Sequence, residues 1–300
     1  MTVTLKELRV HLGAHKSATT HVQETLGACQ PQLHNKGVDY IPLESIRPEM
    51  KALMSSRNWR FVVGGMPLRD AVLGMLQRVG SGAGVVAFSE ENILGSSAEL
   101  LGEVVYPRLR SRLKIVRAMS KVAPVSAFLS IRSFDRVLPG AYVTALRFGE
   151  ISPMDRTRLE DAWGRHSPSW VEVIDRIVGV LPGVPLRIWQ QEVYAENAPY
   201  VLNQFVGVEI ADIPSIAPPK STMTPSAQAV QAAESFVRSF RGSRSDLTAA
   251  VDRIYASMPV SESESRFTLV DDQQRRQMRK QYDRDIEIIQ RRWPGALIRP

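Results

Sequence analysis

Residues 12–21 read LGAHKSATTH, and this stretch decides the fold of the chain. An apolar run at 8–12 leads into it, and apolar residues then recur at helical spacing over 18–33. We therefore expect a short buried strand, a tight turn and a helix. A strand that passes into a helix through a short turn is the repeating unit of α/β proteins.

The turn itself carries the residues of an anion site. Gly13 and Lys16 lie between the strand and the helix, and Ser17, Thr19 and Thr20 supply hydroxyls. The first N–H groups of a helix attract phosphate or sulfate, and a lysine adds a positive charge. The alternative is an ordinary turn in which Ser17 or Thr19 caps the helix and Lys16 faces solvent. Because a lysine, hydroxyls and a buried strand coincide, we favour a bound oxyanion.

The loop differs from that of proteins that bind nucleoside triphosphates. Their pattern, G-x-x-x-x-G-K-[ST], needs two glycines around the phosphate. Val10 stands in place of the first glycine, and His15 stands in place of the second, immediately before Lys16. The sequence therefore predicts a P-loop-like turn and not a Walker loop.

Later apolar runs predict further strands at residues 84–88, 125–131 and 186–189. Ser96 and Glu99 have the spacing of a capping box and predict a helix between the first two of these strands. Residues 170–181 predict another helix. Alternating strands and helices indicate a parallel sheet covered on both faces. The expected fold class is α/β, a three-layer sandwich with a central parallel sheet, a P-loop-like strand-turn-helix and C-terminal helices.

The C-terminal part of the chain is predicted to be helical. Residues 213–225 are rich in proline and predict a surface loop, at the end of which Thr224 caps a helix that opens with Pro225. Only helical patterns follow over 226–300. Because no internal repeat is present, residues 1–300 are expected to form a single domain.

Composition excludes several classes of protein. The chain has 300 residues, 44% hydrophobic and 23% charged, so collagen-like and wholly disordered proteins are excluded. The single Cys29 allows neither an internal disulfide nor a cysteine-based metal site. The spacing of His11, His15 and His21 fits no metal site either, so no metal is expected. We see no membrane span and no leader pattern, which predicts a cytoplasmic protein.

The positive charge is concentrated in two short blocks. The chain carries 38 basic and 31 acidic residues, a net charge of +7, whereas residues 151–272 carry 11 and 16, a net charge of −5. Seven basic residues and no acidic one lie within 104–134. The second block belongs to a C-terminal helix pattern and contains Arg275, Arg276, Arg279, Lys280 and Arg284. Such runs are commonly solvated helix faces, and without interleaved aromatic residues they do not predict a nucleic-acid partner.

The loop resembles the 5′-phosphosulfate loop of bacterial sulfotransferases that use 3′-phosphoadenylyl sulfate (PAPS). The family pattern K-[ST]-G-T-T is matched by Lys16, Ser17, Thr19 and Thr20, with Ala18 at the place of the glycine. The resemblance covers nearly the whole chain and implies PAPS as the sulfuryl donor. It also implies that Lys16 stabilises the charge that develops during transfer. The donor-binding residues of this loop would be Gly13, Lys16, Ser17, Ala18, Thr19 and Thr20.

Residues 86–94, VAFSEENIL, are similar to a family segment in which a glutamate lies near the acceptor. This similarity implies that Glu91 is the catalytic base, and Glu90 is the second candidate for the same role. A carboxylate at the end of a neighbouring strand can indeed take a proton from a hydroxyl or amine. Judged on the residues alone, a solvated acidic loop is the alternative.

Residues 125–142 are similar to the family segment that holds the 3′-phosphate of the donor, which implies this role for Arg132. Arginine matches phosphate geometry well, although an ion pair with Asp135, three residues later on the following helix, is the alternative. Gly140 stands where the family has a serine for the same phosphate, and what replaces that serine is left open.

The expected function is transfer of a sulfuryl group from PAPS to a hydroxyl or amine of a small-molecule or carbohydrate acceptor. The alternatives are a P-loop-type nucleotide kinase and a non-catalytic binder of anionic polymers that uses the two basic blocks. The sequence identifies neither the acceptor nor the oligomeric state.

Overall fold

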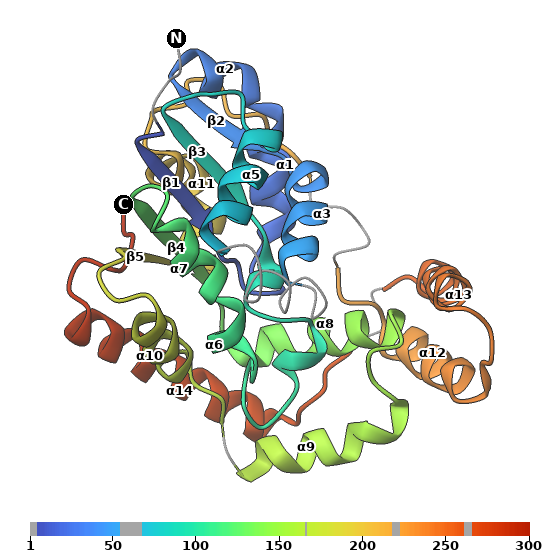
Figure 1. Ribbon diagram of the computed structural model, residues 1–300. Helices are drawn as coiled ribbons and strands as arrows, with labels where there is room; N and C mark the ends of the chain where they lie inside the picture. Colours follow the sequence, from blue (N-terminus) through green and yellow to red (C-terminus); the bar gives the residue numbers. More distant parts are fainter. Residues whose placement is uncertain (1–4, 55–67, 166, 218–222, 261–265) are drawn as a thin grey trace.

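Five parallel strands form the central sheet (Figure 1). The computed structural model describes residues 5–54, 68–165, 167–217, 223–260 and 266–300. The strands lie in the order β2-β3-β1-β4-β5, so the first strand occupies the middle of the sheet. Their bounds are Glu7–His11 (β1), Val38–Ile41 (β2), Val85–Ser89 (β3), Val125–Ile131 (β4) and Leu186–Gln190 (β5). The α/β class and the parallel sheet are thereby confirmed.

The strands are apolar because both faces of the sheet are buried. Successive residues of a strand point to opposite faces. Val86 and Phe88 of β3 therefore belong to one core, whereas Ala87 between them belongs to the other. In β4, Leu129 and Phe128 are divided in the same way.

Helices cover both faces of the sheet and give the predicted three layers. One face packs against α1, α2 and α11, and the other against α3 and the helices from α5 to α8 together with α10. Their bounds are Thr19–Ala28 (α1), Gln30–Asn35 (α2), Leu43–Met54 (α3), Leu68–Val79 (α5), Leu109–Arg112 (α6), Lys114–Met119 (α7), Phe134–Arg147 (α8), Arg156–Arg165 (α9), Trp170–Val180 (α10) and Gln191–Val206 (α11).

The C-terminal part is helical, as predicted. It contains α12 (Ala227–Ser239), α13 (Arg244–Ser257) and the long α14 (Asp272–Arg292). α12 and α13 pack together beside α8, and α14 runs along α8 and α10 (Figure 1). None of the helices that the structure describes has both the length and the apolar character needed to cross a membrane.

Two predictions near the N-terminus are corrected by the structure. The helix expected over 18–33 is two helices that meet at Cys29, because Pro31 takes one of the first positions of α2 and starts a new turn. The strand β2 was not predicted. It has only four residues, and its Asp39 breaks the apolar pattern while its carboxylate accepts a hydrogen bond from the Ser81 N–H.

Two predicted helix starts are also wrong. Only a single 3-10 turn, Ala98–Leu100, forms after Ser96, and no side chain caps it. The Glu99 carboxylate instead binds Arg108 and Arg112. At α12 the cap is Ser226, whose Oγ accepts a hydrogen bond from the Ala229 N–H at 3.1 Å, so the helix begins after the predicted cap and proline.

Candidate functional site

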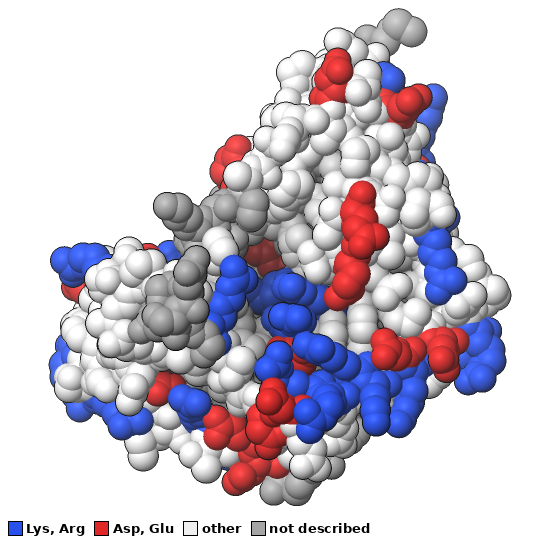
Figure 2. Space-filling model, turned by 180° about the vertical axis from the view of Figure 1, so that it is seen from behind, with Lys and Arg blue, Asp and Glu red and all other residues white. Residues whose placement is uncertain are grey.

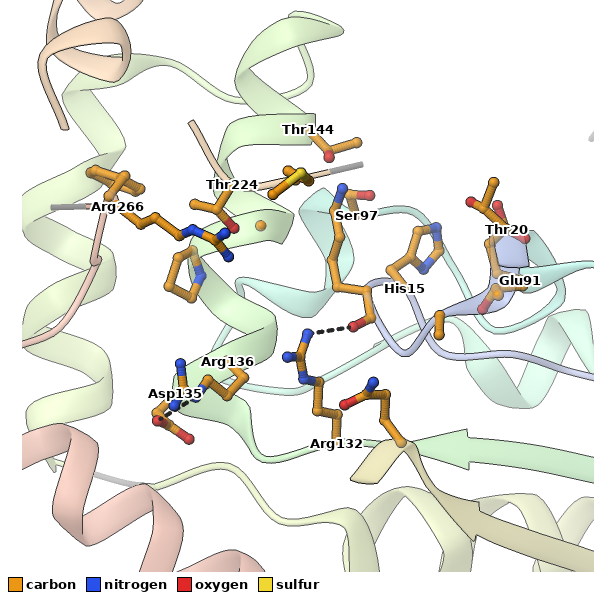
Figure 3. A pocket seen from close by; sticks show the side chains of 18 of the residues that line it. His15, Thr20, Glu91, Ser97, Arg132, Asp135, Arg136, Thr144, Thr224 and Arg266 are labelled. Carbon is orange, nitrogen blue, oxygen red and sulfur yellow. Dashed lines mark hydrogen bonds and ion pairs between the residues drawn. The ribbon is translucent and has the colours of Figure 1, made fainter. Parts of the chain in front are cut away.

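A cavity of about 680 Å³ opens at the carboxyl ends of the strands (Figure 3). The segments that follow β1, β3, β4 and β5 contribute to its walls, together with α8 and two C-terminal segments. In open parallel sheets, ligands bind outside the carboxyl ends of the strands, where the chain connections leave in opposite directions. The connections on the two sides of β1 meet this condition. The cavity volume is typical of sites for small organic ligands.

The turn between β1 and α1 exposes backbone N–H groups. Lys16 and Ala18 have φ angles of 67° and 68°, whereas Ser17 between them is not among the residues with positive φ. Alternation of this kind curves successive N–H groups into a concave site for anions. No side chain in the described ranges caps α1, so the N–H groups of its first turn can bind a ligand.

Ala18 is the cap residue of α1 and adopts the left-handed conformation. The helix predicted to include it begins one residue later, at Thr19. A left-handed backbone costs an alanine about 1–2 kcal/mol relative to its preferred conformation. Glycine, the residue of the resembled loop, would adopt it without this cost. Strain therefore lies in the turn between β1 and α1 itself.

The hydroxyls of the turn have different surroundings. Ser17 is fully buried, and its Oγ donates to the Ala14 carbonyl at 2.6 Å and contacts the Ser130 Oγ at 2.5 Å. Thr19 Oγ1 donates to the same carbonyl at 3.2 Å. Thr20 lines the cavity, and its hydroxyl has no partner among the residues described. The Ser17 hydroxyl thus holds the turn against β4 through these buried contacts and does not reach the cavity.

Lys16 lines the cavity, and its aliphatic chain passes over Gly140 of α8. Burial lowers the pKa of Lys16 to about 8, with the charge of Arg147 adding to the shift and Glu91 opposing it. The ammonium group is therefore largely charged at neutral pH. A bound anion would stabilise that charge.

Glu91 and Glu90 end up in different environments. Glu91 lines the cavity, whereas the Glu90 side chain is wholly buried and caps the short turn after β3 by accepting from the Asn92 N–H at 3.0 Å. Arg47 of α3 binds both carboxylates, at 2.8 Å to Glu90 and 2.7 Å to Glu91. Gln23 of α1 donates to the second Glu91 oxygen at 3.0 Å. Of the two, only Glu91 is available to a ligand.

Glu91 is held in its ionised form. Burial alone would raise the pKa of the Glu91 carboxyl, but the interactions with His15, the Arg47 charge and the hydrogen bond from Gln23 together outweigh it and hold that pKa below its ordinary value. Gly13 lets the turn approach this carboxylate closely. It has a φ of 59°, and a Cβ built there would lie 3.1 Å from the Glu91 Cβ.

Arg132 lies between the two ends of the cavity, with Arg136 and Arg266 on one side and Glu91 and Thr20 on the other (Figure 3). Its Nη1 donates to the Lys16 carbonyl at 3.4 Å, and its buried Nε has no hydrogen-bond partner among the residues described. A buried donor without a partner is costly unless a ligand accepts from it.

The alternative ion pair of Arg132 does not form. The Asp135 carboxylate is bound by Arg279 of α14 at 2.9 Å and by Arg136 at 3.7 Å. Ser133 Oγ also donates to it, at 2.5 Å. With this carboxylate occupied, the Arg132 guanidinium is free of an ion pair within the described part of the chain.

His11 and His15 are neutral side chains next to the cavity. His11 at the end of β1 is bonded to Ser89 Oγ at 2.8 Å and to Ser130 Oγ at 3.1 Å, which ties three strand ends together. Burial lowers the pKa of His11 to about 3 and that of His15 to about 4, so both are neutral at physiological pH. The described residues include no group of three or more metal-ligating side chains.

Several cavity residues escaped prediction as site residues. Arg136 lies one helical turn after Arg132, a spacing that could have pointed to it. Arg266 lines the cavity because an isolated antiparallel bridge joins it to Ser226. No local sequence pattern predicts this bridge. Arg275 was recognised only as part of the second basic block, yet it reaches the cavity wall. Figure 2 shows the resulting gathering of Lys and Arg side chains in and around the hollow.

Comparison with known proteins finds similarity at the level of structure and not of sequence. No model of a protein family matches the chain, and no curated protein matches it at a significant level. A crystal structure of a sulfotransferase from Alicyclobacillus acidocaldarius is similar, with a TM-score of 0.41, 14% identity, and coverage of 83% of this chain and 96% of that one. At this score the similarity is too low to assign a fold family or an activity.

Proposed function

We propose that the protein is a sulfotransferase that moves a sulfuryl group from PAPS to a hydroxyl or amine of a small-molecule or carbohydrate acceptor. The observation that carries the proposal is the arrangement around one cavity of an uncapped helix start, a lysine, an unpaired arginine and an ionised glutamate. These are Thr19, Lys16, Arg132 and Glu91. An anionic nucleotide could take part in several reactions at such a cavity. The resemblance of residues 16–20 to a phosphosulfate loop favours sulfuryl transfer over the others.

The donor is a nucleotide with a phosphosulfate and a separate 3′-phosphate, and the cavity offers groups for both. The N–H groups of the first turn of α1 and the Lys16 ammonium suit the phosphosulfate. The buried Arg132 Nε has no acceptor among the described residues, and an oxygen of the 3′-phosphate could accept its hydrogen bond. Bound there, PAPS would supply an activated sulfuryl group: the acceptor would form a bond to sulfur, the bond from sulfur to the phosphate oxygen would break, and 3′-phosphoadenosine 5′-phosphate would leave.

The side chains then have distinct tasks. Lys16 neutralises charge that accumulates on the oxygens between the entering and leaving atoms, as cations do in phosphoryl transfer. Glu91 accepts the proton of the acceptor hydroxyl or amine at a carboxylate oxygen. Its low pKa makes it a weak base, but it is ionised over the whole neutral range. Arg47 and Gln23 keep the carboxylate in place.

Calorimetric titration tests the proposal. We expect 3′-phosphoadenosine 5′-phosphate to bind the folded protein without added metal, and Lys16→Ala to weaken this binding by about 100-fold. Lys51→Ala on the exposed side of α3 is the matched control and should bind like the native chain. Tight binding of ATP that needs magnesium, with no binding of the bisphosphate, would instead indicate a kinase. Absence of any nucleotide binding would refute the proposal.

A further inference from the structure

A second cavity lies beside α14 and shares none of its described lining residues with the site just described. Its volume is also about 680 Å³, and its walls are formed by α14 and the beginning of α10. We propose that this surface binds an acidic carbohydrate chain, so that the acceptor of the reaction is one unit of that chain. The identity of the acceptor rests on the proposed function, whereas binding of the carbohydrate does not.

Three cations of α14 face this cavity without partners. Arg276, Lys280 and Arg284 are exposed, line the cavity and form no ion pair within the described residues. Their spacing of four residues places them on one helix face, over a rise of about 12 Å. A row of unpaired cations of this length can bind several anionic groups spaced along one ligand. It is longer than a single small anion can contact.

The acidic residues of the cavity do not cancel this charge. The Asp285 side chain is buried, and its oxygens accept from the Trp170 N–H at 2.6 Å and from Ser169 Oγ at 2.9 Å. Its charge is thus used to hold the start of α10. Glu172 is the one exposed acid among the described residues that line the cavity. Three cations therefore stand against one exposed carboxylate.

The remaining lining residues favour a polyhydroxylated ligand over a nucleic acid. Gln273 and Gln277 are exposed amides on the same side of α14, and Ser167 adds a hydroxyl. These groups can exchange hydrogen bonds with sugar hydroxyls. None of the described residues that line the cavity is aromatic, whereas single-stranded nucleic acids are held largely by stacking on aromatic rings. Carboxylate or sulfate groups on a sugar backbone match the surface best.

The surface is continuous with the candidate active site. Arg275 lines the first cavity and its neighbour Arg276 lines the second. Arg279, one helical turn after Arg275 on α14, is bound to Asp135, which belongs to the wall of the first. Figure 2 shows Lys and Arg side chains continuing from the hollow across the lower part of the same face. A chain bound along α14 can therefore place one of its units at the first cavity.

The test compares two triple variants that remove the same charge. R276Q/K280Q/R284Q removes the proposed contacts, and R238Q/R241Q/R253Q removes exposed cations of α12, α13 and the segment between them, away from both cavities. The probes are labelled hyaluronan and heparin oligosaccharides, with neutral dextran and single-stranded RNA for comparison. Binding is followed by fluorescence anisotropy. The nucleotide titration described above is run on the same samples.

We expect the acidic oligosaccharides to bind the native protein, dextran not to bind, and the α14 variant to bind about tenfold more weakly than the control variant. Unchanged nucleotide affinity in that variant would show that the loss is local. Equal losses in both variants, equal binding of RNA, or no binding of the acidic sugars would each overturn the proposal. Carbohydrate binding that depends on α14 in a protein that binds no nucleotide would instead refute the proposed function alone.

Discussion

The aliphatic chain of Lys16 lies directly against Gly140. A Cβ built on this glycine would come within 3.0 Å of the Lys16 Cδ and 3.1 Å of its Cγ. Distances this short require the lysine to move. Where the resembled family has a serine, this chain has a glycine, and the space that it leaves is occupied by the Lys16 side chain on its way to the cavity. Gly140 is therefore a positioning residue for Lys16.

Gly140→Ala tests this relationship. The added methyl group should displace the Lys16 chain and weaken binding of 3′-phosphoadenosine 5′-phosphate by about tenfold. Gly27→Ala, a helical glycine of α1 with open space around it, is the matched control and should leave the affinity unchanged. If calorimetry gives the same affinity for both variants, the lysine does not depend on Gly140.

The strained turn leads to a second prediction. Ala18→Gly relieves the left-handed alanine, which offsets the greater freedom of glycine in the unfolded chain. The free energy of unfolding should stay level or rise by up to about 1 kcal/mol. Ala14→Gly in the same loop lacks this compensation, because Ala14 has no positive φ, and it should lower stability by about 0.5–1 kcal/mol. Urea unfolding curves that rank the two variants in the reverse order would contradict the assigned strain.

The pKa of Lys16 predicts how nucleotide binding depends on pH. Binding needs the charged ammonium, and its pKa in the free protein is about 8. The association constant should therefore fall as pH rises through 8, by at most about tenfold per pH unit. Lys16→Gln should bind weakly with no such dependence, and Lys51→Gln should retain the native profile. A native profile that is flat from pH 7 to 9.5 would argue against a role for this charge.

Acid should destabilise the protein through its buried histidines. The pKa of His11 falls to about 3 and that of His15 to about 4 on folding, from an ordinary value of 6.5. A pKa that is lowered on folding stabilises the protein above pH 6.5, and this stabilisation is lost as pH falls towards those values, by up to about 1.4 kcal/mol per pH unit for each group.

His11→Gln should therefore reduce the slope of unfolding free energy against pH between 6.5 and 4, as measured by urea unfolding. His34→Gln changes an exposed histidine of α2 and should leave the slope as it is. Equal slopes in the native chain and in both variants would show that His11 does not control the acid transition.

Much of the fold could be predicted because buried parallel strands are apolar on both faces. Residues 125–131 match β4 in full, and the other three predicted runs overlap strands. β2 lacked this signal because it is short and contains Asp39. The Ser96–Glu99 pattern failed because Glu99 takes part in ion pairs with distant arginines, and such tertiary contacts override a local capping signal.

The candidate site could be predicted only where its residues are close in sequence. The turn at 12–21 contains a complete local pattern, so its place between β1 and α1 was predictable. Glu90 is buried by the turn after β3 and by Arg47, whereas Glu91 stays partly exposed at the cavity. This difference arises from tertiary packing, which the sequence does not show. Arg266 and Arg275 reach the cavity through the packing of C-terminal segments far along the chain.

Transfer of labelled sulfate from PAPS to a panel of hydroxyl, amine and acidic oligosaccharide acceptors tests the central claim most directly. The native protein should label at least one acceptor, Glu91→Gln should bind the nucleotide but turn over about 100-fold more slowly, and Lys16→Ala should be inactive. Failure of the folded, nucleotide-binding protein to label any acceptor, or full turnover by Glu91→Gln and Lys16→Ala, would contradict the account.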